Sequence, residues 1–334
     1  MSKKIGILLI NVGTPSAPTK EAVQTYLNEF LTDPSVIQAP AFVRNILFKK
    51  IIIPRRSPQS AKKYQKIWTD KGSPLLSFSL DFSNDLQEVM GPQYIVRVAM
   101  RYGEPSLQSV IQELKSQGVE KFWMAPVFPQ FAEATTGSVI KKIKELLPED
   151  NFQILNEFYK SDSFIKSCAQ ILESSRSRWD HLLFSYHGLP VGQLKKIPGC
   201  YSTQNCCELA EKNAVKCYRS QCLVTSQRLA QALGLNPDQW SVSFQSRLGP
   251  VKWIQPYTDD RARKLAEQGV KRLAVFAPSF VVDGLETLEE LAIELKDTFL
   301  EAGGVEYNYI PCLNSESHWV KGFAEHLKRE LSET

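Results

Sequence analysis

The chain has 334 residues, which is enough for one large α/β domain or for two lobes. Its contents of 43% hydrophobic and 23% charged residues are ordinary for a globular protein. The net charge of +4 is not gathered into a continuous stripe of Lys and Arg, which argues against nucleic acid as a partner. No run of about 18 uninterrupted apolar residues predicts a membrane-spanning helix.

The first predicted element is a short apolar strand. Two lysines precede an apolar stretch that stops at Asn11, and this stretch is too short for a signal peptide. We therefore expect a first strand in a cytoplasmic protein.

The next feature along the chain is a segment from Pro40 to Pro58 in which apolar residues are mixed with basic ones. This lip could lie against a membrane surface or a hydrophobic ligand without crossing a bilayer, or it could be a surface helix whose lysines snorkel. Arg55 and Arg56 stand beside it, and paired arginines suit a flat apolar ligand with carboxylate tails.

Three sequence patterns occur twice, in the same order. Residues 6–15 parallel 181–190, residues 101–105 parallel 247–250, and residues 118–126 parallel 269–278. We interpret the repeat as two related α/β lobes. The first spans 1–155 and includes the lip at 40–58; the second spans 156–334 and includes a Cys-rich insertion at 195–223.

The predicted fold class is α/β, with two similar Rossmann-like lobes. Each lobe alternates strands with helices such as the one whose apolar stripe is Leu107, Val110, Ile111 and Leu114, and this order predicts a parallel sheet flanked by helices. Ligands of such folds bind at the carboxyl ends of the strands, so we expect the active cleft between the lobes. The chain has neither a Gly-x-Gly-x-x-Gly motif nor a Walker loop, so the sequence does not predict a phosphate-binding loop for a nucleotide.

A histidine ends the strand predicted for HLLFSYHGLP, from His181 to Pro190. His187 could have a purely structural role, as a polar residue at a strand end whose hydrogen bonds are all made within the protein. However, the tight turn through Gly188 and Pro190 fixes its imidazole, and a neutral imidazole can accept a proton or bind a divalent metal.

An acidic helix follows a second strand, in VKRLAVFAPSFVVDGLETLEE. Asp283 and Glu286 come directly after the strand, and Glu286, Glu290 and Glu294 recur every four residues on one helix face. Such a face is usually just solvated. At a sheet edge, the same row suits a hard divalent cation or a proton relay.

Five of the seven cysteines fall within 23 positions: Cys200, Cys206, Cys207, Cys217 and Cys222. Cysteines of a cytoplasmic chain are not expected to form structural disulfides. The spacing matches neither a zinc finger nor a common ferredoxin closely, yet four thiolates suit a tetrahedral zinc or a two-iron cluster, with one cysteine spare. A metal-free cysteine loop is the alternative.

The chain resembles ferrochelatase over nearly its whole length. The matching motifs are LLINVGTP at 8–15, RSPQSAKKY at 56–64, GSPLL at 72–76, RYGEP at 101–105, PQFAEATTGS at 129–138, FSYHGLP at 184–190, FQSRLGPVKWIQPYTDD at 244–260 and DGLETLEEL at 283–291. The chain lacks a long C-terminal extension and in this resembles bacterial members of the family.

The resemblance assigns roles to individual residues. His187 is similar to the active-site histidine and Glu286 to the glutamate that faces it across the porphyrin, so both are candidate catalytic residues that handle the substrate iron or its protons. Asp283, Glu290 and Glu294 resemble the carboxylate path. Substrate-binding positions are expected at Arg55, Arg56, Tyr64, Arg101, Tyr102, Trp253 and Phe280.

The resemblance also implies a cofactor. Several family members bind a [2Fe-2S] cluster, and some bacterial ones hold it within an insertion that this segment resembles. We therefore expect four of the five clustered cysteines to bind a [2Fe-2S] cluster, with structural zinc as the alternative and the choice between Cys206 and Cys207 left open.

The function implied by the resemblance is insertion of Fe²⁺ into protoporphyrin IX to give protohaem, the terminal step of haem biosynthesis. The partners are then protoporphyrin IX and ferrous iron, for a monomer or homodimer that contacts the inner membrane peripherally through its lip. Three rivals are iron insertion into coproporphyrin, a cobalt or nickel chelatase for a more polar tetrapyrrole, and a porphyrin or haem carrier without catalysis. A carrier gains nothing from a row of mutually repelling acids.

Overall fold

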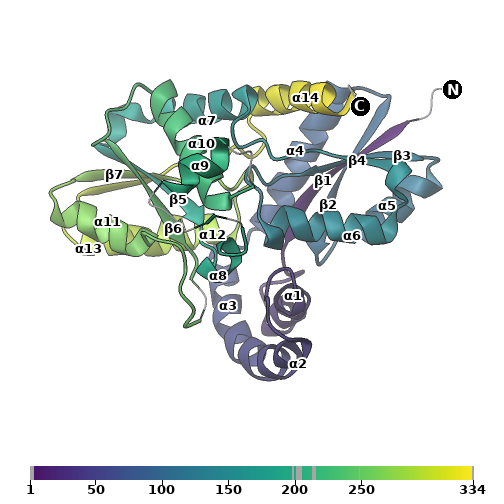
Figure 1. Ribbon diagram of the computed structural model, residues 1–334, viewed down its shortest axis with the longest axis horizontal. Coiled ribbons are helices and arrows are strands. Elements are labelled where there is room, and N and C mark those ends of the chain that lie inside the picture. The colour runs from purple at the N-terminus through teal and green to yellow at the C-terminus, as the bar shows by residue number, and fades with distance from the viewer. Residues whose placement is uncertain (1–3, 198, 201–204, 213–215, 248, 333–334) are drawn as a thin grey trace. The chain divides into compact units, whose positions relative to one another are not determined.

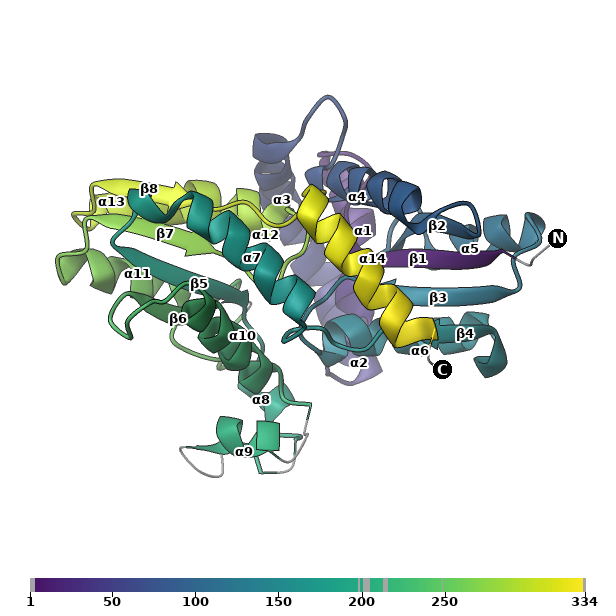
Figure 2. The ribbon, with the colours of Figure 1, turned by 90° about the horizontal axis from the view of Figure 1, so that it is seen from above.

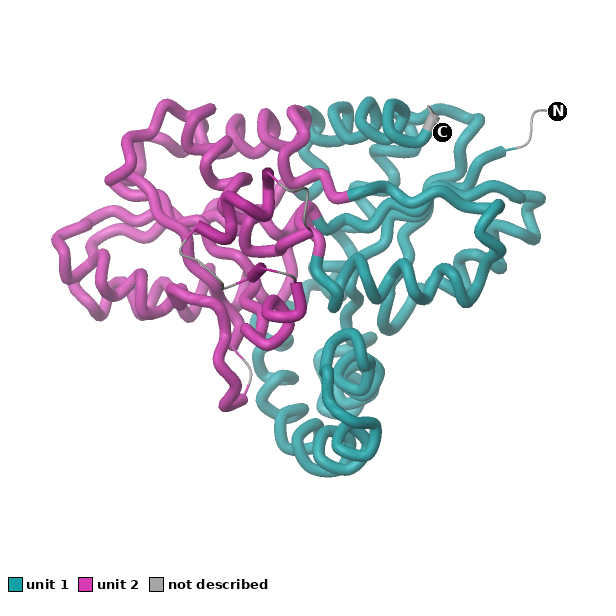
Figure 3. Tube along the Cα trace, in the orientation of Figure 1, with its two compact units in different colours: residues 1–128, 132–156, 314–334 teal, residues 129–131, 157–313 magenta. Residues whose placement is uncertain are grey.

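The computed structural model describes residues 4–197, 199–200, 205–212, 216–247 and 249–332. The chain forms two compact units, shown in Figure 3. Unit 1 comprises residues 1–128, 132–156 and 314–334, and unit 2 comprises residues 129–131 and 157–313. The last helix of the chain therefore belongs to unit 1.

Unit 1 contains a four-stranded parallel sheet in the order β2-β1-β3-β4. Its strands are β1 (Ile5–Gly13), β2 (Tyr94–Tyr102), β3 (Lys121–Pro126) and β4 (Phe152–Ile154). The helical elements are α1 (Lys20–Thr32), α2 (Ala41–Val43), η1 (Arg44–Ile52), α3 (Ile53–Ile67), α4 (Pro74–Met90), α5 (Leu107–Ser116), η2 (Glu133–Gly137), α6 (Ser138–Leu146), η3 (Glu149–Asn151) and α14 (Ser317–Ser332).

Helices cover both faces of this sheet, which explains why β1 is almost continuously apolar. On one face, α5 and α6 pack their apolar stripes against β1, β2 and β3. On the other face lie α4 and α14, whose Phe82, Trp319 and Phe323 rings pack together (Figure 1). The predicted stripe of α5 is confirmed as buried, and the Ser106 side chain caps that helix by accepting from the Ser109 N–H.

Unit 2 repeats the same arrangement, with the order β6-β5-β7-β8. Its strands are β5 (His181–His187), β6 (Trp240–Gln245), β7 (Arg272–Phe276) and β8 (Glu306–Tyr309). Its helical elements are α7 (Asp162–Ser174), η4 (Arg176–Arg178), α8 (Val191–Leu194), α9 (Cys206–Lys212), α10 (Tyr218–Ala232), α11 (Thr258–Glu267), α12 (Leu285–Leu288), η5 (Glu290–Glu294) and α13 (Leu295–Glu301). The prediction of two similar lobes, each with a parallel sheet flanked by helices, is confirmed.

In unit 2, α11, η5 and α13 share an apolar core with β5 and β7. Helix α10 packs against α7, β6 and the short helix α9, and Figure 2 shows α10 between α9 and β5. The described cysteine-rich helix α9 therefore contacts the rest of unit 2 through α10.

The internal repeat holds for the first strand and the third strand of each unit, but one of the predicted matches is wrong. In unit 1, the Met100 N–H donates to the Pro105 carbonyl at 2.7 Å. In unit 2, the equivalent bond runs from the Phe244 N–H to the Pro256 carbonyl at 2.9 Å. The counterpart of Pro105 is therefore Pro256 and not Pro250, because the turn after β6 is longer than the turn after β2.

Candidate active site

The carboxyl end of β5 extends beyond the neighbouring strand on one side. β5 pairs with β6 as far as His187 and Gln245, but it pairs with β7 only as far as Phe184 and Phe276. Past that point, the backbone of His187 bonds to side chains. Its N–H donates to Ser279 Oγ at 3.2 Å, and its carbonyl accepts from the Tyr218 hydroxyl at 2.8 Å.

The imidazole of His187 is oriented by the turn that follows it. Its Nδ1 lies 2.7 Å from the Gly188 carbonyl, and a carbonyl can only accept, so Nδ1 carries the proton of the neutral ring. Nε2 is then the basic nitrogen, and no described residue hydrogen-bonds to it. A Cβ at position 188 would meet the Gln245 carbonyl oxygen at 2.7 Å, so the close approach of this turn requires glycine.

Gln245 connects the end of β5 to the acidic helix. Its backbone carbonyl accepts from the Gly188 N–H at 2.8 Å, and its side-chain amide donates to the Glu286 carbonyl at 2.7 Å. The Ser185 hydroxyl donates to the side-chain oxygen of Gln245, Oε1, at 2.6 Å. The sequence analysis assigned no role to Gln245, although it lies within the FQSRLGP motif.

Glu286 stands in the first turn of α12 and is partly buried. No described residue bonds to its carboxylate, whereas its backbone is held by Gln245. The structure thus fixes the main chain of Glu286 at the same sheet edge as His187 and leaves the carboxylate available for chemistry.

Asp283 is buried, and both its oxygens accept hydrogen bonds from protein groups. The Thr287 and Tyr309 hydroxyls donate to Oδ1, and the Cys312 N–H donates to Oδ2 at 3.2 Å. Thr287 also accepts from the Gly284 N–H, which closes the first turn of α12. This carboxylate anchors the helix that carries Glu286.

The remaining acids of the row lie on the π-helical turn η5. Glu290 is partly buried and accepts from the Ser246 hydroxyl, while Glu294 is exposed. The row therefore runs from a half-buried carboxylate at Glu286 to a solvated one at Glu294.

Two aromatic residues flank His187. The Phe280 ring lies 6.4 Å from the imidazole, centroid to centroid. Trp253 is buried, forms an isolated bridge with Pro190, and would lie 3.2 Å from a Cβ at Gly188. Both predicted substrate-binding aromatics of unit 2 thus lie close to the end of β5.

Arg101 and Tyr102 of unit 1 are engaged in a compact polar cluster with Asp33 and Ser138. The Arg101 guanidinium pairs with Asp33, and their side chains are only 15% and 9% exposed. The Tyr102 hydroxyl and the Ser138 hydroxyl each donate to Asp33 Oδ2, at 3.0 and 3.2 Å. Asp33 is a residue that the sequence analysis missed, because no motif singled it out.

The ionisation of Asp33 follows from these contacts. Burial acts to raise its pKa, but the hydrogen bond from the Ser35 N–H and the Arg101 charge outweigh this and leave the pKa below its usual value. Burial raises the pKa of Tyr102 well above its usual range, so its hydroxyl stays protonated and donates.

The lip lies on α2, η1 and the start of α3. Its apolar side chains are exposed, with Phe42 at 67% and Ile46 at 55%, and Leu47 and Ile51 are exposed beside them. Arg55 and Arg56 are also exposed, whereas Tyr64 is buried and its ring packs edge-on against Trp68. No helix of the described residues is long and apolar enough to cross a membrane.

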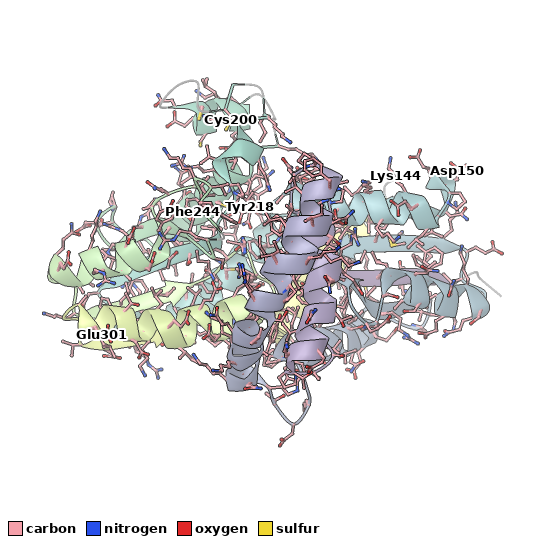
Figure 4. The ribbon with its side chains drawn as sticks, turned by 90° about the horizontal axis from the view of Figure 1, so that it is seen from below. Lys144, Asp150, Cys200, Tyr218, Phe244 and Glu301 are labelled. Carbon is pink, nitrogen blue, oxygen red and sulfur yellow. The ribbon has the colours of Figure 1, made fainter. Side chains whose placement is uncertain are left out.

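All seven cysteines are described, and all are free thiols. In the cysteine-rich segment at 200–222, Cys207 and Cys217 are neighbours, and the influence of Cys207 lowers the pKa of Cys217. Arg219 Nη1 donates to Cys207 Sγ at 2.9 Å, and the Ser220 hydroxyl donates to the Cys207 carbonyl at 2.6 Å. Figure 4 marks this segment by Cys200 and the start of α10 by Tyr218.

Two further thiols of the segment lie near that pair, Cys200 near Cys217 and Cys222 near Cys207. Cys222 is fully buried, which raises its pKa. Within the described ranges, no three or more His, Cys, Asp or Glu side chains are already arranged to hold a metal ion. The predicted insertion also includes residues 201–204 and 213–215, which lie outside the described residues.

Comparison with known proteins gives a consistent result over the whole chain. The family model described as Ferrochelatase matches residues 4–331. The chain is 43% identical to a protein named ferrochelatase from Bdellovibrio bacteriovorus, over 98% of this chain and 99% of that protein. Ferrochelatases from Coxiella burnetii and Pseudomonas fluorescens are 39% and 42% identical, and each alignment covers at least 94% of either chain.

Solved structures share the fold at low sequence identity. The sirohydrochlorin chelatase SirB from Bacillus subtilis subspecies spizizenii, in complex with cobalt, aligns with a TM-score of 0.55 at 8% identity, over 99% of this chain and 96% of that one. CbiX, described as the terminal enzyme for biosynthesis of sirohaem in denitrifying bacteria, aligns with a TM-score of 0.51 at 12% identity, over 98% of this chain and 100% of that chain. At such identities the likeness concerns the fold alone.

Proposed function

Because the chain belongs to the ferrochelatase family, we propose that it inserts ferrous iron into protoporphyrin IX to give protohaem. The observation that supports this most directly is the geometry of His187: Nδ1 is tied to the Gly188 carbonyl, so the basic Nε2 points away from the turn with no described partner. A base in this state is what the removal of pyrrole protons requires.

The reaction exchanges two pyrrole protons for one Fe²⁺ ion, and the protein must accept those protons. We assign the first proton transfer to His187 Nε2. Glu286, whose carboxylate no described residue engages, handles the second proton or the incoming iron, because oxygen ligands suit a hard cation. Glu290 and the exposed Glu294 continue this row to solvent and conduct protons or iron.

The remaining site residues serve to bind the porphyrin. Phe280 and Trp253 supply apolar surface beside His187, which suits a flat macrocycle. The exposed guanidinium groups of Arg55 and Arg56 suit the propionates. Arg101, Tyr102 and Tyr64 are already packed or bonded within unit 1, so we assign them a role in shaping the surface that meets the porphyrin.

The decisive experiment mixes the purified protein with Fe²⁺ and porphyrin under anaerobic conditions and follows the haem spectrum. We expect haem from protoporphyrin IX at a higher kcat/KM than from coproporphyrin, since the larger number of carboxylates on coproporphyrin would need more basic residues. Preferential turnover of coproporphyrin would transfer the assignment to that substrate. Tight porphyrin binding without any metal insertion would identify a carrier and contradict the proposal.

We also propose that the insertion binds a [2Fe-2S] cluster through Cys200, Cys207, Cys217 and Cys222. Thiolates are the ligands such clusters use, and Cys207 is tied to the first turn of α10, between Cys217 and Cys222, by the Ser220 hydroxyl. The four thiols would have to draw together around the cluster, because, within the described part of the chain, no three of them are already arranged to hold a metal ion. Cys207 rather than Cys206 is chosen because its thiol contacts Cys217 and Arg219. When bound, the cluster would supply an iron–sulfur centre that ties the insertion to α10.

The visible spectrum and the iron, sulfide and zinc content of the isolated protein test this proposal. We expect a brown protein with two iron and two sulfide per chain. Cys207→Ser should abolish the colour and Cys206→Ser should retain it. A colourless protein with one bound zinc would replace the cluster by a structural zinc site, and equal loss in both variants would contradict the ligand assignment.

We further propose that the lip contacts a membrane surface peripherally. Phe42, Ile46, Leu47 and Ile51 are exposed apolar side chains on one helical segment, with Lys49 and Lys50 among them, and this combination suits an anionic bilayer. Sedimentation with phosphatidylglycerol vesicles should recover the protein, and Phe42→Ser with Ile46→Ser should reduce the recovery. Val305→Ser, which removes an equally exposed apolar residue of unit 2, should not.

A further inference from the structure

The carbonyl of His187 has one hydrogen-bond partner that comes from the cysteine-rich segment. Because β7 stops pairing with β5 at Phe184, no strand backbone is available to this carbonyl, and the Tyr218 hydroxyl takes that place at 2.8 Å. Tyr218 is the first residue of α10 and directly follows Cys217. The base and the cysteine segment are thus joined by a single side chain.

The Tyr218 hydroxyl also lies at the centre of a small buried network. The Cys222 thiol and the Ser279 hydroxyl lie in its surroundings, and Ser279 accepts from the His187 N–H at 3.2 Å. Tyr218 is buried, and its hydroxyl donates to the His187 carbonyl, so this hydrogen bond is shielded from solvent.

We infer that Tyr218 is a positioning residue for His187, and that through it the cysteine segment sets the position of the base. This inference rests on the proposed role of His187. The carbonyl of His187 belongs to the peptide that leads into Gly188, and the Gly188 carbonyl holds Nδ1 of the ring at 2.7 Å. A shift of the peptide that Tyr218 holds therefore reorients the imidazole.

The connection to the cysteines is equally short. Cys217 adjoins Tyr218 in sequence, Cys222 lies one helical turn later, and Ser220 ties the same turn to the Cys207 carbonyl at 2.6 Å. Any change that moves Cys207 against Cys217 moves the start of α10. Because Tyr218 reaches from that turn to β5, its hydroxyl transmits the movement.

Tyr218→Phe tests the positioning role, and the chain offers a matched control. Tyr186 is also a fully buried tyrosine with a hydrogen-bonded hydroxyl, but its partner is Ser226 on α10 at 2.7 Å and not the backbone of His187. We expect Tyr218→Phe to lower kcat by about 10- to 100-fold with little change in the KM for porphyrin or iron. Tyr186→Phe should leave kcat near that of the unmodified protein, at a similar loss of stability.

The orientation of the imidazole can be followed without any assay of activity. The chain has four histidines, so ¹⁵N-histidine labelling gives four ring signals, and His187→Gln identifies the one of interest. In the unmodified protein, at a pH where the ring is neutral, we expect Nδ1 to carry the proton; in Tyr218→Phe the signal should shift toward a mixture of tautomers. An unchanged tautomer together with equal kcat in both Phe variants would overturn the inference even if the enzyme is active. Inactivity of the unmodified protein would instead overturn the proposed function.

A double-mutant cycle tests the link to the cysteines. Cys207→Ser should lower kcat several-fold in the unmodified background and have little further effect in Tyr218→Phe, because the connecting hydroxyl is already absent. Independent effects that multiply, or no effect of Cys207→Ser in the unmodified background, would overturn the coupling.

Discussion

Units 1 and 2 share one strand order, yet the polar groups at the carboxyl ends of their strands are in different states. At the end of β2 in unit 1, Arg101, Tyr102, Asp33 and Ser138 bond to one another. At the end of β5 in unit 2, the backbone of His187 is held, while no described residue bonds to Nε2 or to the carboxylate of Glu286.

The difference shows that one architecture can hold its strand-end polar groups in two ways, by bonds among the side chains in unit 1 and by bonds to the main chain in unit 2. In unit 1 the buried charges are paired with each other, so removing one partner destabilises the fold, and the pair leaves little to offer a substrate. In unit 2 the hydrogen bonds are made to the backbone of His187 and Glu286, which fixes the positions of these residues. No described residue bonds to the imidazole Nε2 or to the carboxylate. The same contrast separates Asp283, whose oxygens are occupied, from Glu286, whose oxygens are not.

Replacing His187 by Ala should show the largest effect on activity. Removal of a general base lowers kcat by about 10²- to 10⁴-fold, and the free energy of unfolding should change little because the contacts of residue 187 that hold β5 are made by the backbone. Anaerobic haem formation measures kcat, and fluorescence quenching measures porphyrin binding, which should persist. Near-normal turnover would contradict the assignment of the base.

Replacing Asp33 by Ala should show the opposite pattern, a loss of stability with a smaller loss of kcat. The change leaves Arg101 buried and unpaired, which typically costs about 3 kcal/mol. Urea denaturation measures the loss. Asp180→Ala breaks an exposed pair with Arg272, in which the side chains are 41% and 42% exposed, and should cost less than about 1 kcal/mol. Equal costs for both changes would show that the cluster of unit 1 is not a stabilising one.

The fold, and the positions of His187 and the neighbouring acids at strand ends, could be predicted from the sequence because their signals are local. β5 is a continuous apolar run followed at once by His187 and a Gly-x-Pro turn, and Asp283 with Glu286 follows β7 within a single motif. Buried parallel strands require such runs, so a strand and the residue at its carboxyl end can be predicted together.

The partners of those residues could not be predicted, because they are brought in from distant elements. Asp33 lies 68 positions from Arg101, and Tyr218 lies 31 positions from His187. No periodicity links such pairs, and each is set by the packing of helices on the sheet. Asp283 illustrates the consequence: its place in an acidic row suggested a path for iron or protons, whereas Thr287, Tyr309 and Cys312 occupy its oxygens.

β5 has a histidine at each end, and the buried one, His181, makes the stability of the fold depend on pH. His181, at the amino end, is buried against Ser241, and burial followed by the charge of Arg261 lowers its pKa to about 4, against the opposing influence of Asp238. Between this pKa and the unfolded value of about 6.5, the unfolded chain binds a proton that the folded chain does not. Stability is therefore fully present above pH 6.5 and falls as the pH drops toward 4.

Between pH 7 and pH 5 this loss should amount to about 2 kcal/mol, measured as the shift of the urea midpoint with pH. His181→Gln should be less stable than the unmodified protein at pH 7 and should lack this part of the pH dependence. If the pH dependence is the same in His181→Gln, the loss at low pH arises from other groups.

The smallest expected effect distinguishes an anchoring carboxylate from a conducting one. Asp283→Asn keeps an acceptor for Thr287 and Tyr309 but replaces the oxygen that accepts from the Cys312 N–H with a donor, so we expect a loss of about 1 kcal/mol of stability. Because α12 loses part of its anchor, kcat should fall a few-fold through Glu286, with the KM for iron unchanged. Asp297→Asn, an exposed change on α13, is the control and should alter neither quantity. The opposite result would be a raised KM for iron and a loss of kcat as large as that of Glu286→Gln, with no change in stability. Asp283 itself would then carry protons or iron, and the distinction between occupied and available carboxylates would not hold for it.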